Sequence, residues 1–233
     1  MPTVASIRRA VPALLLAMLL AACAHAPAPA PTAAAPMPAL GDVGDYYSRE
    51  LAAGRQVLRV DSKRSLIAIT VRRGGALARF GHDHVIAVRT LDGYVAPDAN
   101  RADLHFRLDQ MTVDEAALRT EAGLDKQPSA DDIDGTRHNM LVRVLDAEHY
   151  PLVQLHVQRA AQDGALTLAI TLHGVTRTFA PPVQIAQRDG TLTASGSISF
   201  KQSDFGLVPY SLMDGALAVQ DQLELRFHIV AAR

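Results

Sequence analysis

Apolar and polar side chains alternate with a period of two through most of the chain beyond residue 57. In each run the apolar side chains fall on one face of an extended chain and the polar ones on the other. This pattern is typical of a half-buried strand in an antiparallel sheet. The clear runs are residues 67–71, 104–108, 153–157, 166–172 and 223–229.

Turn residues separate these runs and indicate further strands. His173-Gly174 follows the fourth run, and Arg188-Asp189-Gly190 precedes residues 191–200. Asp-Gly between alternating segments is a strong hairpin signal. With residues 84–94 and 177–185 the count reaches about eight strands, a number that closes into a barrel able to hold one small ligand. We therefore expect an all-β domain, an eight-stranded antiparallel barrel accompanied by one helix.

The helix is expected in the one segment where the apolar spacing is helical, residues 133–145. Ser129 is the expected N-cap, and Asp131 and Asp132 would lie favourably in the first turn. This helix should lie across one end of the barrel and plug or frame it.

The N-terminus has the pattern of an export signal. Arg8 and Arg9 precede an apolar run at residues 11–22, shorter than the roughly 20 residues of a membrane-spanning helix. The run ends in Leu20-Ala21-Ala22-Cys23, which resembles the lipobox of bacterial lipoproteins, whose cysteine becomes the acylated N-terminus. The alternative is an ordinary signal peptide cleaved nearby. Small residues before the sole cysteine favour lipidation of Cys23.

These observations divide the chain into three parts. Residues 1–22 are predicted to be a signal peptide, residues 23–54 a lipidated N-terminus and Ala/Pro-rich tether, and residues 55–233 the barrel domain. Residues 24–38 are nearly all Ala or Pro and cannot bury enough apolar surface to fold. A short helix is expected around residues 46–53.

The lipid anchor predicts a location on the periplasmic side of the bacterial cell envelope. Ala24 follows the cysteine, where lipoproteins retained at the inner membrane often carry Asp. The outer membrane is therefore the predicted site of anchoring. More than one acyl chain would make this anchoring stable, since each buried methylene contributes about 0.8 kcal/mol.

Several separated motifs occur in a fixed order from about Val57 to the C-terminus. They are Arg59-Val60-Asp61-Ser62, Thr136-Arg137-His138, Asp146-Ala147-Glu148-His149-Tyr150-Pro151, Leu172-His173-Gly174-Val175-Thr176-Arg177, Ser203-Asp204-Phe205-Gly206-Leu207 and residues 221–230. In this order they resemble the YceI-like family of periplasmic lipid- and polyisoprenoid-binding proteins, which have a lipocalin-like barrel.

The resemblance implies that an amphiphilic lipid or polyisoprenoid binds inside the barrel, in a non-enzymatic carrier or sequestering role. Inward Leu, Ile, Val and Phe side chains would form a dry tunnel, in which each buried methylene contributes about 0.8 kcal/mol. Alternatively, these side chains fill one another as a solid core, since small barrels adopt both arrangements.

Phe80-Gly81-His82-Asp83-His84 departs from the family pattern, because many relatives carry apolar residues in place of the two histidines. The two-residue spacing points both imidazoles to one face of a strand. One interpretation is a zinc, copper, nickel or iron site completed by His138, His149, Asp83 or Glu148. The other is a hydrogen-bonded pair, or a contact to a ligand head group, at the barrel mouth. No third ligand lies at a diagnostic spacing, which favours the second interpretation.

Three further residues are candidates for ligand contact. Arg137 and His138 on the helix would either clasp a phosphate or quinone head group or anchor the helix to the barrel rim. Phe205 is grouped with Phe80 as a ligand-contacting residue, although its loop is also expected to plug the barrel end. The stretch from Thr112 to Ser129 is expected to be longer than in relatives and to alter the mouth.

Other classes of function find less support. The net charge of −1 argues against nucleic-acid binding. No Gly-x-Ser-x-Gly, Walker or dinucleotide motif is present, and the sole cysteine is assigned to lipid, so neither an enzyme nor a cofactor is predicted. The alternative functions are a metal-binding envelope protein using His82 and His84, and an adhesion or assembly factor without a ligand. The sequence does not indicate the oligomeric state, and a dimer is compatible with it.

Overall fold

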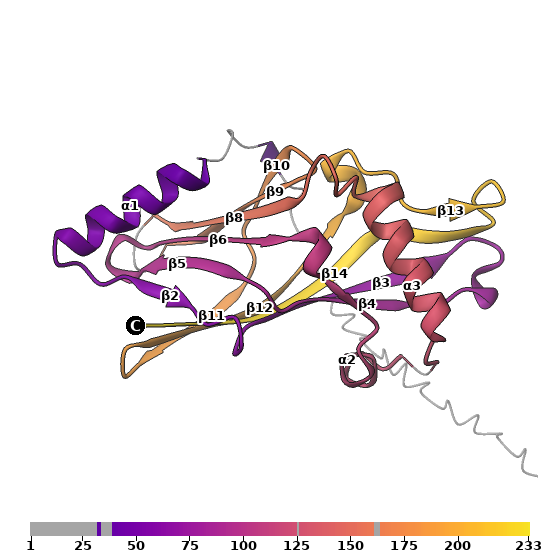
Figure 1. Cartoon of the computed structure of the whole chain (residues 1–233), viewed down its shortest axis with the longest axis horizontal. Coiled ribbons are helices and arrows are strands. Elements are labelled where there is room, and N and C mark those ends of the chain that lie inside the picture. The colour runs from indigo at the N-terminus through magenta and orange to yellow at the C-terminus, as the bar shows by residue number, and fades with distance from the viewer. Residues whose placement is uncertain (1–31, 34–38, 125, 161–163) are drawn as a thin grey trace, which may run out of the picture.

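A computed structural model describes residues 32–33, 39–124, 126–160 and 164–233 (Figure 1). The helices are α1 (Leu40–Ala52), α2 (Ala116–Glu121) and α3 (Ala130–His138), and α3 continues into a π-helical segment, η4 (Asn139–Val144). The strands are β1 (Thr32–Ala33), β2 (Leu58–Val60), β3 (Leu66–Gly74), β4 (His84–Val88), β5 (Asp92–Ala96), β6 (Arg101–Arg107), β7 (Thr112–Val113), β8 (Leu152–Arg159), β9 (Leu166–Leu172), β10 (Val175–Phe179), β11 (Val183–Arg188), β12 (Thr191–Lys201), β13 (Ser211–Leu212) and β14 (Leu217–Ala232).

Strand β14, with 16 residues, joins the parts of one antiparallel sheet of 14 strands. One edge of β14 pairs with β12, which carries β11. The other edge pairs with β3, which leads to β4 and β7, and near its end with β2, which leads through β5, β6, β8 and β9 to β10. The register aligns Ile198, Leu225, Ile69 and Ile86 across β12, β14, β3 and β4. The alternation of each strand therefore builds a continuous apolar row.

The five clear alternating runs lie in strands β3, β6, β8, β9 and β14, except for Leu108, which begins a 3-10 turn after β6, so this part of the sequence analysis is confirmed. Both predicted hairpin turns are also confirmed. His173 and Gly174 have φ of 52° and 72°, and Asp189 and Gly190 have φ of 50° and 74°. Two successive left-handed residues match the twist of the flanking strands in a two-residue hairpin.

The prediction of a closed, eight-stranded barrel is wrong. Residues 84–94 divide into β4 and β5, and residues 177–185 divide into β10 and β11. Pro181 and Pro182 lie between β10 and β11, where they lack the N–H groups that a continuous strand would donate. In the described residues no ladder joins β10 to β11 or β12, so the sheet is open along this line.

The predicted helix is confirmed. The Ser129 hydroxyl accepts a hydrogen bond from the Asp132 backbone N–H, and the Asp132 side chain accepts one from the Ser129 backbone N–H. This reciprocal cap satisfies two of the free donors at a helix start. In Figure 1, α3 lies at one end of the sheet and α1 at the other. The expectation of one helix in the β-domain is incomplete, because α2 also forms there.

Helix α1 is longer than the short helix predicted around residues 46–53. It packs on the outer face of the sheet. Tyr47 is 2% exposed, and its hydroxyl donates to Asp103 at 2.8 Å. Arg101 and His156 also hydrogen-bond to Asp103, at 2.7 and 2.6 Å. The His156 side chain is therefore partly covered. Packed residues thus also lie N-terminal to Arg55, in α1.

The Asp103 carboxylate is held ionised beneath α1. Burial alone would raise the pKa of Asp103, but hydrogen bonds from His156, Arg101 and Tyr47 outweigh this effect and hold it below its usual range. Burial beside this carboxylate raises the pKa of Tyr47.

The other N-terminal predictions cannot be compared with the structure. The signal peptide at residues 1–22, Cys23 and most of the tether lie outside the described residues. Among the helices that the structure describes, none combines the length and apolar character needed to cross a bilayer.

We expect Tyr47→Ala to lower the free energy of unfolding by about 3–5 kcal/mol, as for other large buried aromatic residues. The matched control is Leu51→Ala on the same helix, where the side chain is 57% exposed and the expected change is within about 0.5 kcal/mol. Urea denaturation followed by circular dichroism measures both. Equal, small effects would contradict the packing of α1 as part of the folded domain.

Candidate ligand-binding cavity

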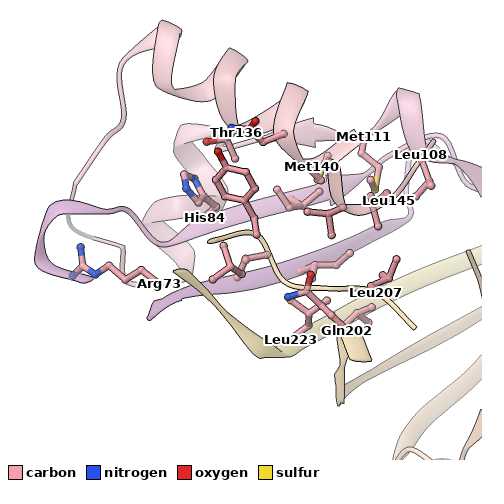
Figure 2. A pocket seen from close by; sticks show the side chains of 18 of the residues that line it. Arg73, His84, Leu108, Met111, Thr136, Met140, Leu145, Gln202, Leu207 and Leu223 are labelled. Atoms are coloured by element: carbon pink, nitrogen blue, oxygen red, sulfur yellow. The ribbon is translucent and has the colours of Figure 1, made fainter. Parts of the chain in front are cut away.

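A cavity of about 510 Å³ lies between the sheet and the helical segment α3–η4 (Figure 2). This volume falls within the range of small-molecule sites in proteins. Its walls are mainly apolar, and they include the row across β12, β14, β3 and β4 formed by Ile198, Leu225, Ile69 and Ile86. The inward apolar side chains therefore do not pack together completely, and they leave an open space between them.

Helical residues form one wall of the cavity. Met140 and Val144 of η4 line it together with Gly135 and Thr136 of α3. The π-helical turn widens the helix at this point, and such turns occur frequently at functional sites. In Figure 2, His84 and Thr136 lie toward one end of the cavity and Leu145 and Leu207 toward the other.

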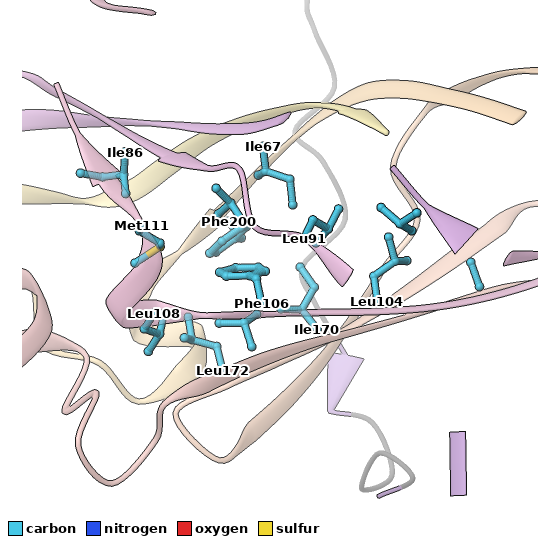
Figure 3. Close-up of a cluster of buried hydrophobic side chains, with 14 of the residues drawn as sticks. Ile67, Ile86, Leu91, Leu104, Phe106, Leu108, Met111, Ile170, Leu172 and Phe200 are labelled. Atoms are coloured by element: carbon cyan, nitrogen blue, oxygen red, sulfur yellow. The ribbon is translucent and has the colours of Figure 1, made fainter. Parts of the chain in front are cut away.

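The interior next to the cavity is packed (Figure 3). Phe106 and Phe200 lie among Ile170, Leu172 and Met111 in the main hydrophobic core, and all five side chains also line the cavity. Leu58, Leu91 and Phe205 are buried in the same core and do not line the cavity. The two arrangements considered from the sequence thus coexist, with a solid core in one part and an open space in another.

The polar lining is concentrated at the mouth. The mouth carries His82 in the loop before β4, His84 at the start of β4, Arg73 of β3, and Asp131 and Asp132 in the first turn of α3, whereas the polar side chain of Gln202 lines the cavity near Leu207 and Leu223. The ring centroids of His82 and His84 are 6.2 Å apart. Both imidazoles therefore reach the same opening, His84 from the start of β4 and His82 from the loop before it rather than from the same strand.

A buried ion pair between Asp114 and Arg119 lies behind the mouth and holds His84 in place. Nδ1 of His84 lies 2.6 Å from Oδ2 of Asp114, whose side chain is fully buried. Oδ1 of Asp114 accepts hydrogen bonds from the Val85 backbone N–H at 3.0 Å and from Arg119 at 2.6 Å. Arg119 also donates to the carbonyl of Asp83 at 2.7 Å. These contacts fix the imidazole against the end of the sheet.

The Asp114 carboxyl is held in its charged form. Burial would raise its pKa, but hydrogen bonds from His84, the Val85 N–H and Arg119 outweigh burial and hold the pKa below its usual range. Asp114 has a φ of 57°, a left-handed conformation that Asp tolerates better than most residues.

Sequence reasoning missed Asp114 and Arg119. Both lie in the stretch from Thr112 to Ser129 that was expected to alter the mouth, but no periodic pattern distinguishes them. Asp114 follows the two-residue strand β7 and Arg119 lies in α2, so neither belongs to a long alternating run. A left-handed Asp between two short elements leaves only a weak signal in a sequence.

The structure separates the predicted site residues into two groups. Phe80, His82 and His84 line the cavity. Phe80 is 64% exposed, and the Arg79 guanidinium lies 4.5 Å from its ring centroid. The remaining candidates, Arg137, His138 and Phe205, do not line it.

Arg137 and Phe205 have structural contacts instead. Arg137 donates to the backbone carbonyl of Asp109, which anchors α3 to the chain after β6 and matches the rim-anchoring alternative. Phe205 is 0% exposed, and its ring centroid lies 6.2 Å from that of Phe179 and 5.4 Å from that of Phe200. In this structure both residues therefore contact the protein itself rather than the cavity.

The metal hypothesis lacks a third ligand. In the described part of the chain no group of three or more His, Cys, Asp or Glu side chains is placed to hold a metal ion. Asp83 instead lies near Arg72 and Arg73, at 3.6 and 3.8 Å, and His149 hydrogen-bonds to Asp146 at 2.8 Å.

Comparison with known proteins identifies the domain. The family model for the YceI-like domain matches residues 59–231. Among solved structures, BcnA from Burkholderia cenocepacia superposes with a TM-score of 0.53 at 18% identity, over 73% of this chain and 98% of that one. A polyisoprenoid-binding domain from Saccharophagus degradans, implicated in plant cell wall breakdown, superposes with a TM-score of 0.54 at 12% identity, over 76% and 98% of the two chains. At these identities the likeness concerns the fold. The curated proteins include no match to the chain.

We expect Asp114→Asn to lower the free energy of unfolding by about 3 kcal/mol at neutral pH, because it leaves Arg119 buried without a charged partner. An unfolded Asp has a pKa of about 3.9, and the native pKa is lower. The ionised carboxylate therefore stabilises the fold above about pH 4, and this contribution is lost as the pH falls through the native pKa. The difference between wild type and variant should shrink accordingly in acid.

Urea denaturation from pH 7 to pH 3 measures this difference. The control is Asp134→Asn on the exposed side of α3, where the expected change is within about 0.5 kcal/mol. A difference between wild type and Asp114→Asn that does not vary with pH would contradict a depressed native pKa.

Proposed function

The chain belongs to the YceI-like domain family, and on this basis we propose that it binds one amphiphilic lipid or polyisoprenoid in the cavity between its sheet and α3. The role proposed is that of a non-catalytic carrier or sequestering protein. The apolar tail lies along the walls formed by β12, β14, β3 and β4, and the head group lies at the polar mouth near His82 and His84.

The observation that carries the proposal is the combination of volume and lining. A cavity of about 510 Å³ is bordered by aliphatic side chains from distant strands of the sheet, such as Leu155 of β8 and Leu168 of β9 as well as Ile69 of β3 and Leu225 of β14. Its histidine, arginine and aspartate side chains gather at the mouth. An amphiphile has the same division, because burying its tail is favourable and its head group retains polar partners. The Saccharophagus degradans domain of similar fold is described as polyisoprenoid-binding, which supports this class of ligand.

Filling the cavity tests the proposal directly. We expect Ile198→Trp, which adds bulk to a lining position on β12, to weaken binding of a long-chain isoprenoid alcohol at least tenfold. Ser199→Trp is the matched control, because Ser199 is exposed on the same strand and does not line the cavity. Native mass spectrometry for co-purified lipid and a fluorescent-probe displacement assay give the two readouts. Equal binding by both variants would place the ligand elsewhere.

Ligand length provides a second test. In a homologous series of alcohols we expect the affinity to rise about fourfold for each added methylene, since each contributes about 0.8 kcal/mol. The rise should stop when the tail fills the cavity. Isothermal titration calorimetry measures the series, and an affinity independent of chain length would be evidence against tail burial.

We also propose that the domain is held at the cell envelope as a lipoprotein, through Cys23. Support comes from the sequence alone, from the apolar run at residues 11–22 and the lipobox-like Leu20-Ala21-Ala22-Cys23. We expect metabolic labelling with an alkynyl fatty acid to tag the full-length protein and the Cys23→Ser variant to lose the tag and leave the membrane fraction. Labelling that persists in Cys23→Ser would rule out this anchor.

A further inference from the structure

The imidazole of His84 is held through only one of its two nitrogens. Nδ1 lies 2.6 Å from Asp114, and the ring lines the cavity. Within residues 39–124, 126–160 and 164–233, no hydrogen bond to Nε2 is present. The Nε2 nitrogen of this fixed ring is therefore available to a ligand.

The Asp114 carboxylate determines what this nitrogen does. An ionised carboxylate only accepts hydrogen bonds, so His84 must donate its Nδ1–H to Asp114. Arg119 already pairs with the same carboxylate at 2.6 Å, and its charge compensates that of Asp114. His84 can therefore satisfy Asp114 as a neutral ring, and in a neutral ring protonated at Nδ1 the other nitrogen, Nε2, is an acceptor.

The charges around the mouth determine which charge on a ligand head group is favourable there. Asp131 and Asp132 line the cavity from the first turn of α3. Hydrogen bonds from the Ser129 hydroxyl and backbone N–H hold the pKa of Asp132 below its usual range, so this carboxylate carries negative charge at the mouth. Arg73, which also lines the cavity, is engaged by the Gly81 carbonyl at 2.8 Å and by Asp83 at 3.8 Å. An anionic head group would thus meet the carboxylates of Asp131 and Asp132, beside an Arg73 guanidinium that already has partners within the protein.

Resting on the proposed function, we infer that Nε2 of His84 accepts a hydrogen bond from a hydroxyl head group, so that the mouth selects neutral alcohols or phenols over phosphates. Asp114 acts as a positioning residue, since it fixes the tautomer of His84 without touching the ligand. The ligand class is thereby narrowed to amphiphiles that donate a hydrogen bond.

Three probes with the same tail separate the possible head-group chemistries: farnesol, farnesyl methyl ether and farnesyl phosphate. The ether keeps the oxygen but has no proton to donate, and the phosphate carries negative charge. We expect farnesol to bind wild-type protein about three- to tenfold more tightly than the ether, the value of one net hydrogen bond, and more tightly than the phosphate. Isothermal titration calorimetry at pH 7.5 measures all three.

Substitutions then assign the preference to His84. His84→Phe keeps a ring in the wall, and we expect it to bind farnesol and its ether equally. His105→Phe, on the outer face of β6 and away from the cavity, should keep the wild-type preference. Histidine ¹⁵N NMR of the unaltered protein gives a measurement that does not depend on how the variants fold. It should show Nε2 of His84 unprotonated at pH 7.5, with a ¹⁵N chemical shift that changes only when farnesol binds.

Each outcome decides a separate point. Equal affinities of wild type for farnesol and the ether, tighter binding of the phosphate, or a protonated Nε2 would overturn the inference while leaving a lipid-binding cavity in place. Failure of all three probes to bind would overturn the proposed function as well.

Discussion

The register along β14 is the constraint on which the rest of the structure depends. This strand of 16 residues pairs with β12 on one edge and with β3 and β2 on the other. Because side chains alternate between faces, a slip of one residue would turn Leu223, Leu225 and Phe227 outward and remove the apolar wall. The cavity and the core both follow from this alignment.

The sequence predicted the elements that depend on local pattern. Alternation identified β3, β6, β8, β9 and β14, the Asp189-Gly190 pair identified a hairpin, and Ser129 with Asp132 identified the start of α3. The strand count and the closure of the sheet were not predictable in the same way. They depend on where pairing stops, as at Pro181 and Pro182, and on which edges meet in space. Helix α1 was underestimated because its packing rests on long-range contacts, such as those of Tyr47 with Asp103 and Tyr94.

The site was predicted in part for a related reason. The sequence drew attention to His82 and His84, and both line the cavity, although only His84 lies on a strand. The partners that define their chemistry, Asp114 and Arg119, lie about 30 residues farther along the chain and are brought in by tertiary folding alone. Arg137 and Phe205 show the converse. They belong to motifs that resemble the family, yet their contacts are with the Asp109 carbonyl and with Phe179 and Phe200, which hold the fold.

The open line between β10 and β12 has a mechanical consequence. A fully closed ring of strands has a circumference fixed by its backbone hydrogen bonds, so dilating it means breaking a ladder. Along this line, in the part of the chain described, the two margins meet through aromatic rings, with Phe179 and Phe200 at 5.7 Å between centroids. Separating the two margins along this line would therefore break side-chain contacts but, among the described residues, no backbone hydrogen bonds between paired strands.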